Sequence, residues 1–185
     1  MQRVFFGIPV DQKTQKQINE LLSPVKKSLQ AVRWVPEQNR HLTLAFLGNR
    51  PAGIIENLVH SMDKAYQGEG SFITGPANLA RFPNSRGNII ALVFKADEHL
   101  SHLYRVTQEY LVANGFDFNR TQFRPHITLG RFKRRSRVTA DIKQQTNIRI
   151  QVGKVTFYQS TLTPSGSVYL ALNETKLEKT RVKIN

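Results

Sequence analysis

The chain has 185 residues and is strongly basic: 27 Lys and Arg against 13 Asp and Glu give a formal net charge of +14, which favours a polyanionic partner such as nucleic acid. Its 39% hydrophobic and 22% charged content is typical of a soluble globular protein, and its length suits one domain over residues 1–185. The absence of cysteine excludes disulfides, thiolate catalysis and zinc–thiolate sites and is compatible with a cytoplasmic location, and no apolar run approaches the ~20 residues of a membrane span.

The N-terminal part of the chain predicts a strand, a helix and a short extended segment. Residues 4–10 are β-branched and aromatic, which is typical of a strand. Asp11 is the expected N-cap of a helix over residues 13–22, which the Ser-Pro pair at 23–24 then interrupts, either as a kink or as the cap and first residue of a second short turn through Leu29. Residues 32–35 are extended and precede the first of two related motifs.

The rest of the chain alternates further helices and strands. Apolar residues at helical spacing predict helices over residues 52–67 and about 100–111. Further extended segments are expected at residues 71–74, 77–82, 89–94, 148–162 and 167–172. The polar tail is expected to fray after about residue 174. This order predicts an α+β protein with two pseudo-symmetric lobes, each an antiparallel sheet backed by helices, and a central cleft between them.

The pattern His-x-Thr-Leu occurs twice, beginning at His41 and at His126. Side chains alternate between the faces of a strand, so His41 and Thr43 share one face, and the apolar residues around them, including Phe46, are expected on the other. His126 and Thr128 repeat this arrangement. One copy occurs by chance, but two copies, each in an amphipathic strand, suggest a duplicated half-site whose halves meet in the cleft.

Two histidines and two threonines suit the cleavage of a phosphodiester. An imidazole has an ordinary pKa of ~6.5, so one ring can accept a proton from water while the other delivers a proton to the leaving oxygen. The threonine hydroxyls can donate hydrogen bonds to the phosphate, and no metal is required. The alternative interpretation is two surface histidines beside threonines that merely favour strands.

Several other residues are candidates for substrate binding. Arg124 and Arg131 flank the second motif and suit a phosphate, and Trp34 could stack on a base; the alternatives are solvated arginines and core packing. Phe82 is a further aromatic candidate, for which core packing is the favoured interpretation. The basic connector at residues 133–137 could follow an RNA backbone or be a solvated loop.

The remaining histidines do not predict a metal site. His99 and His102 are three residues apart, a spacing that can share a metal ion, but no carboxylate constellation completes such a site. His60 falls on the polar side of its helix. We therefore expect neither a metal nor another cofactor.

These motifs resemble those of the two-histidine (2H) phosphoesterase superfamily, and most closely its RNA 2′,3′-cyclic phosphodiesterases, also called 2′-5′ RNA ligase-like proteins. The resemblance runs nearly end to end. It rests on Arg-Val-Phe-Phe-Gly-Ile at 3–8, Val-Arg-Trp-Val at 32–35, His-Leu-Thr-Leu-Ala-Phe-Leu-Gly at 41–48, Gly-Phe at 115–116 and Phe-Arg-Pro-His-Ile-Thr-Leu-Gly-Arg at 123–131. The sequence departs from the family at Arg40, where an apolar residue is commoner, and at Ala91, where many relatives carry tryptophan.

The resemblance implies a bilobal fold and metal-free opening of a 2′,3′-cyclic phosphate at an RNA 3′ end, which leaves a 2′-phosphate. It implies that His41 is the proton donor and His126 the proton acceptor, with Thr43 and Thr128 binding the phosphate. The same site would run backward to join 2′-5′ linkages. From the residues alone the two histidines are equivalent, so donor and acceptor stay open at this point.

The leading hypothesis is thus a cytoplasmic, monomeric cyclic phosphodiesterase that acts on RNA with a cyclic phosphate end or on a small cyclic nucleotide. Within the same superfamily, a 2′-5′ oligonucleotide phosphodiesterase or an ADP-ribose cyclic phosphodiesterase would use the same reacting groups. A non-catalytic RNA-binding module is the alternative from a different class. It would bind long RNA in a strongly salt-dependent way without turning over a mononucleotide.

Overall fold

The computed structural model describes residues 1–117, 122–133, 142–164 and 166–178. Within these residues the helices are α1 (Gln12–Ser28), α2 (Ala52–Ala65) and α3 (Glu98–Ala113), with a short 3₁₀ turn η1 (Glu37–Asn39). The strands are β1 (Gln2–Pro9), β2 (Val32–Trp34), β3 (His41–Arg50), β4 (Phe72–Thr74), β5 (Asn78–Phe82), β6 (Ile89–Val93), β7 (His126–Phe132), β8 (Lys143–Gln145), β9 (Ile150–Val152), β10 (Lys154–Thr163) and β11 (Gly166–Lys176). The prediction of an α+β fold is confirmed.

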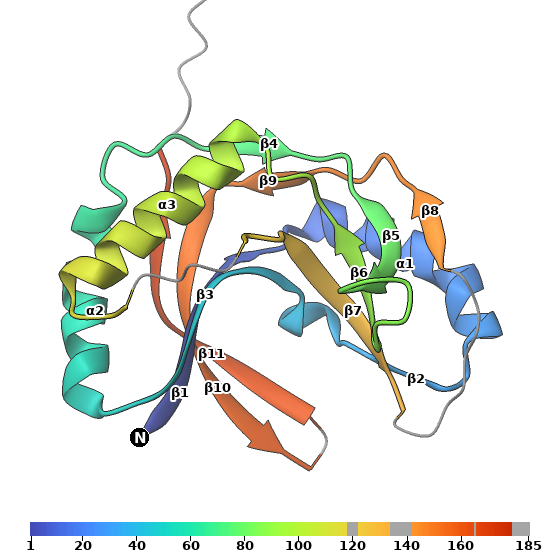
Figure 1. The fold of residues 1–185 in the computed structure, drawn as a ribbon, viewed down its shortest axis with the longest axis horizontal. Coiled ribbons are helices and arrows are strands. Elements are labelled where there is room, and N and C mark those ends of the chain that lie inside the picture. Colours follow the sequence, from blue (N-terminus) through green and yellow to red (C-terminus); the bar gives the residue numbers. More distant parts are fainter. Residues whose placement is uncertain (118–121, 134–141, 165, 179–185) are drawn as a thin grey trace, which may run out of the picture.

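One antiparallel sheet organises the molecule, with its strands in the order β11-β10-β1-β3-β7-β6-β5-β8 and β2 paired to β7. Figure 1 shows α2 and α3 beside the half that contains β1 and β3, and α1 beside the half that contains β5 to β8. The halves meet at β3 and β7, for which the backbone pair is Leu42 with Ile127. The two expected sheets are therefore continuous, and β4 and β9 form a separate pair.

The core lies on one face of this sheet. Val4, Phe6 and Ile8 of β1 alternate into it and are at most 1% exposed, since every second strand residue shares a face. The N-cap Asp11 accepts a hydrogen bond from the Thr14 backbone nitrogen, as predicted, and begins α1. Ile18 of α1 is completely buried, so the apolar stripe of the helix covers the core.

Three predicted boundaries are wrong. Helix α1 continues through Pro24 to Ser28, because Leu22 and Leu29 on either side of the proline are buried and packing outweighs the lost backbone donor. The expected strand over residues 148–162 is interrupted at Gly153, so that β9 pairs with β4 and β10 pairs with β1. The tail does not fray at 174: β11 continues to Lys176 and Leu177 is buried, while residues 179–185 lie outside the described part.

None of the helices in the described ranges is both long and apolar enough to span a membrane.

Candidate active site

The two His-x-Thr motifs lie on adjacent strands where the two halves of the sheet meet. Leu42 and Ile127 are backbone partners and completely buried. The residues on either side of them, His41 and Thr43 on β3 and His126 and Thr128 on β7, are all partly exposed and point to the opposite face. We call this surface the motif face. The structure therefore places these four side chains together on one surface.

A bulge in each strand returns one more side chain to the motif face. In both strands the sixth residue of the motif is exposed after two consecutive buried residues, because the pairing register shifts by one residue there. The exposed residue is Phe46 on β3 and Arg131 on β7. Strict alternation predicted Phe46 in the core, and this expectation is wrong. Phe46 pairs with Phe5 and is 56% exposed. The Arg3 guanidinium lies 4.7 Å from the centroid of its ring.

Both histidine rings are fixed by the same backbone device. The Nδ1 of His41 lies 2.8 Å from the carbonyl oxygen of Asn39, and the Nδ1 of His126 lies 2.9 Å from that of Arg124, in each case two residues upstream. A carbonyl only accepts, so Nδ1 carries hydrogen and donates, and Nε2 is left for chemistry on the motif face. The two halves thus present the same ring nitrogen.

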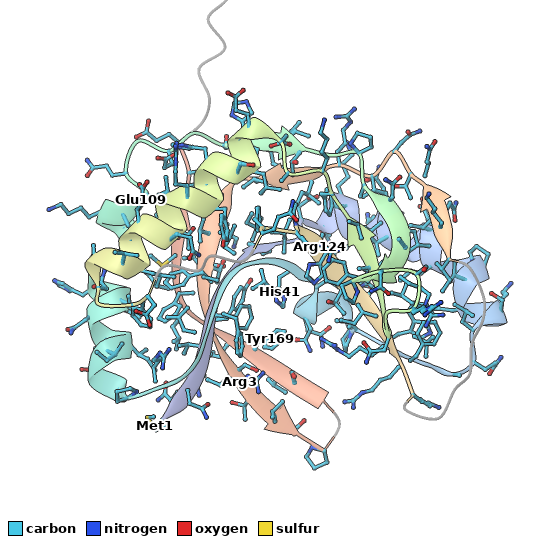
Figure 2. All side chains as sticks on the ribbon, in the orientation of Figure 1. Met1, Arg3, His41, Glu109, Arg124 and Tyr169 are labelled. Atoms are coloured by element: carbon cyan, nitrogen blue, oxygen red, sulfur yellow. The ribbon has the colours of Figure 1, made fainter. Side chains whose placement is uncertain are left out.

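His41 lies in an aromatic surrounding. Its ring centroid is 4.6 Å from that of Phe5, 5.2 Å from that of Tyr169 and 5.9 Å from that of Tyr158. Figure 2 shows Tyr169 beside His41, with Arg3 farther along the same half. Gly7 lies beneath the ring, and a Cβ there would approach the His41 Cδ2 to 3.3 Å. The absence of a side chain at Gly7 makes room for the imidazole.

His126 lies among cations instead. Phe82 stacks on its ring with centroids 3.9 Å apart, and the Arg124 guanidinium lies 4.7 Å from the Phe82 ring centroid. Arg124 also donates a hydrogen bond to the carbonyl of Pro83, which holds its side chain across the β5–β6 turn. Core packing was the favoured interpretation of Phe82, and the contact with His126 shows that this was wrong. In Figure 2 the labelled Arg124 lies between the two halves of the molecule.

The surroundings make both rings neutral in the free protein. Burial lowers the pKa of His41 to about 4; the Asn39 carbonyl opposes this shift and the nearby His126 adds to it. Burial also lowers the pKa of His126, again opposed by a backbone carbonyl, and the positive charges of Arg124 and Arg131 lower it further. Burial is therefore the largest cause for both rings, and only His126 also has the charges of arginines acting on it.

Trp34 does not reach the motif face. It pairs with Gly130 on β7, and a Cβ added at Gly130 would come within 2.9 Å of the Trp34 ring, so the indole packs on the core side of the sheet. Lys26 lies over this ring, 5.8 Å from its centroid. The prediction of Trp34 as a base-stacking platform is therefore wrong. Of the basic connector, only Lys133 belongs to the described residues.

His99 and His102 are engaged elsewhere. The Nε2 of His102 lies 2.9 Å from a carboxylate oxygen of Glu69, and His99 stacks on Phe72. Both line a cavity of about 690 Å³ between α3 and β4 that contains none of the motif residues. Among the described residues, no group of three His, Asp or Glu side chains is arranged to hold a metal ion.

Sequence reasoning missed Phe46, Tyr158 and Tyr169. The tyrosines come from the β10–β11 hairpin, and nothing in their sequence links them to the motifs. Phe46 had a signal, because it follows His41 by five residues as Arg131 follows His126. Aligning the motif that begins at His41 with the motif that begins at His126 would have placed Phe46 on the same face as Arg131.

Comparison with known proteins gives one consistent family. The model for LigT-like phosphoesterases matches residues 8–89. An RNA 2′,3′-cyclic phosphodiesterase of Thermotoga maritima is 30% identical over 181 residues, which cover 95% of this chain and 96% of that protein. A protein of the same name from Methanothermobacter thermautotrophicus is 26% identical and covers 90% and 94% of the two chains.

Solved structures share the fold over nearly the whole chain. The Thermus thermophilus protein TT0787 superposes with a TM-score of 0.84 at 20% identity, covering 97% of this chain and 100% of that one. Escherichia coli LigT complexed with 3′-AMP superposes with a TM-score of 0.77 at 24% identity, covering 95% and 98%. At these identities the likeness establishes the architecture.

Proposed function

The chain belongs to the LigT-like phosphoesterase family of the 2H superfamily, and we propose that it hydrolyses 2′,3′-cyclic phosphates at RNA 3′ ends to 2′-phosphomonoesters. The observation that carries the proposal is the pair of histidines on one face, each with Nδ1 bound to a backbone carbonyl and Nε2 free. Thr43 and Thr128 beside them supply two hydroxyl donors for the phosphate oxygens.

In this proposal His126 is the base and His41 the acid. Nε2 of His126 takes a proton from water as the water oxygen bonds to phosphorus, the bond from phosphorus to O3′ breaks, and O3′ takes a proton from Nε2 of His41. With a 5′-hydroxyl in place of water as the nucleophile, the same forward steps would form a 2′-5′ linkage. Arg131 and Arg124 support this assignment, because their charges keep His126 deprotonated and ready to accept.

The acid has to be created by the substrate. With a pKa of about 4, His41 is neutral at neutral pH in the free protein and has no proton to give at Nε2. The negative charge of a bound cyclic phosphate opposes the burial that lowers this pKa. His41 lacks the arginine neighbours of His126, so it is the ring on which the substrate's charge can place a proton.

Phe46 and Arg3 suit the nucleobase and backbone of the substrate. An aromatic ring that is 56% exposed on the motif face offers a stacking surface, and stacking a base is worth about 1–3 kcal/mol. The net charge of +14 favours RNA as the larger ligand. Both histidines come from one chain, which supports a monomer as the active form, and the absence of cysteine fits a cytoplasmic location.

The test is hydrolysis of a 2′,3′-cyclic mononucleotide and of a cyclic-phosphate-ended RNA in the presence of EDTA. We expect a 2′-phosphate product, and a kcat about 10²- to 10⁴-fold lower in His41→Ala and in His126→Ala. His60→Ala, an exposed histidine of α2, is the matched control and should retain full activity. A metal requirement, a 3′-phosphate product, or activity that survives both motif substitutions would contradict the proposal. RNA binding without turnover would favour the non-catalytic module.

A further inference from the structure

The short turn η1, which precedes His41, is hydrogen-bonded to strand β11. The Asn39 carbonyl oxygen accepts the hydrogen bond of His41 Nδ1 at 2.8 Å. The side chain of the same residue donates from Nδ2 to the carbonyl oxygen of Ser167 on β11, at 2.6 Å. One residue thus connects the orientation of the His41 ring to the strand that also carries Tyr169, a ring neighbour of His41.

A buried arginine holds the turn from the other side. Arg40 is 4% exposed, and its Nη1 donates to the side-chain oxygens of Gln15 and Asn19 on α1, both at 2.9 Å. Gln15 in turn donates to the backbone carbonyl of Glu37 at 2.9 Å, and Asn19 donates to the Glu37 carboxylate at 2.6 Å. The three residues of η1 are therefore bound to α1 at the start of the turn and to β11 at its end.

The burial of Arg40 in this arrangement destabilises the folded state. Within the described residues no carboxylate forms an ion pair with Arg40, whose guanidinium meets two neutral amide oxygens and keeps a buried Nε without a hydrogen-bond partner. Burying a cation without a paired anion costs free energy, and burial accordingly lowers the pKa of Arg40, a shift that the negative charge of Glu37 opposes. A single 3₁₀ turn contributes little stability of its own to offset that cost.

We propose that Asn39 and Arg40 are positioning residues for His41: together they fix the backbone carbonyl that orients its ring. The second motif holds its carbonyl through other residues, since the side chain of Arg124 is bound to Pro83. Asn39 and Arg40 should therefore affect His41 and leave His126 unchanged. The activity measurements below rest on the proposed function, whereas the measurement of the ring tautomer does not.

Arg40→Met separates positioning from a structural role. A methionine fills similar space without a buried charge but leaves the side-chain oxygens of Gln15 and Asn19 without this donor, so the two effects oppose each other and the free energy of unfolding should change little. Because a small displacement of a reacting group is costly, we expect kcat to fall about 10- to 100-fold with KM unchanged. A variant that loses stability but keeps its kcat would overturn the proposal for Arg40.

Asn39→Ala and Asn39→Asp remove the donor to Ser167, the second with almost no change of shape. The matched control is Asn173→Ala. Asn173 lies on β11 and, like Asn39, donates from Nδ2 to a backbone carbonyl, in this case that of Val59 at 3.2 Å. We expect both Asn39 variants to lose about 10-fold or more in kcat at unchanged KM, and Asn173→Ala to keep wild-type kcat. Equal kcat in the Asn39 variants and the control would overturn the proposal.

The tautomer of each histidine gives an independent readout. Nitrogen-15 spectra of the imidazoles should show hydrogen on Nδ1 of both rings in the wild type. In Asn39→Ala and Arg40→Met, His41 should become a mixture of tautomers while His126 stays as it is. An unchanged His41 tautomer in both variants would refute the proposal even if the wild type turned over no cyclic phosphate, so its failure is distinguishable from that of the proposed function.

The pH profile supplies the last distinction. The groups that face His41 from packed elements are His126 of β7, Tyr158 of β10 and Tyr169 of β11. The Asn39 carbonyl stabilises the protonated ring, so weakening that bond should move the alkaline limb of the kcat profile, which reports the acid in the substrate complex, to lower pH. The acidic limb, which reports His126, should not move. A uniform loss of rate with both limbs in place would contradict the positioning role.

Discussion

Substrate binding is expected to protonate His41. Raising its pKa from about 4 in the free protein to about 7 requires about 4 kcal/mol, at ~1.4 kcal/mol per unit. One phosphate charge ~4 Å from the ring provides about 4 kcal/mol at an effective dielectric constant of ~20. The two magnitudes agree, so the charge of a cyclic phosphate is sufficient to convert this histidine into an acid.

The assay uses His126→Gln, which removes the proposed base and allows the cyclic nucleotide to bind without turnover. Binding of 2′,3′-cyclic AMP is measured by calorimetry at pH 6 in buffers of different ionisation enthalpy, which gives the number of protons taken up. With a pKa of about 4 free and about 7 bound, the His41 ring is about 1% and about 90% protonated at this pH, so uptake should approach about one proton.

The control is the double variant with His41→Gln, in which uptake should vanish while binding persists. A His126→Gln protein that binds the nucleotide without taking up a proton would refute the reasoning, because the acid would then not form from His41.

Three further predictions concern stability and substrate affinity. Gly130→Ala should lower the free energy of unfolding by about 1–3 kcal/mol, because its Cβ would meet Val32 Cγ1 at 2.6 Å; an unchanged denaturation midpoint would contradict this contact. Phe46→Ala should raise KM about 10-fold while the melting temperature stays constant, since the ring is exposed, and a fall in stability without a change in KM would place Phe46 in the core after all. The folded-state pKa of His41 lies below its unfolded value, so the fold favours the neutral ring. The free energy of unfolding should therefore fall by up to about 3 kcal/mol as the pH drops from about 6.5 to about 4. In urea titrations, the His41→Gln variant should lose this part of the pH dependence.

The site could largely be predicted because its chemistry is local and duplicated. His41 and Thr43, and His126 and Thr128, stand two residues apart in amphipathic strands, and alternation alone places each pair on one face. Alternation could not predict that β3 and β7 are adjacent, because pairing between distant strands depends on the whole topology.

The errors arise where the backbone departs from regular geometry or where packing outweighs propensity. Phe46 was expected in the core because a bulge that turns two successive residues inward leaves no signature in a run of apolar residues. Trp34 was expected on the motif face, but Gly130 opposite it leaves a space on the core side that the indole fills. Ser23-Pro24 was expected to kink α1 or to begin a second short turn, but buried leucines on both sides stabilise one continuous helix.

The asymmetry between the two histidines was also beyond the sequence. The His-x-Thr motifs are equivalent; apart from Arg124 and Arg131, which lie close to His126 in the sequence, the difference comes from residues distant in the chain. Tyr158 and Tyr169 surround His41, whereas Phe82 and its partner Arg124 flank His126. Only the folded sheet brings these neighbours together, and they are what supports one ring as acid and the other as base.

The most direct test of that assignment is a cyclic phosphate in which sulfur replaces the leaving O3′. A thiolate leaves without a proton, so this substrate removes the need for an acid and retains the need for a base. His41→Ala should recover most of the wild-type rate on the sulfur substrate, whereas His126→Ala should remain inactive. Rescue of His126→Ala and not of His41→Ala would reverse the two roles, and rescue of neither would contradict proton donation by a histidine as the account describes it.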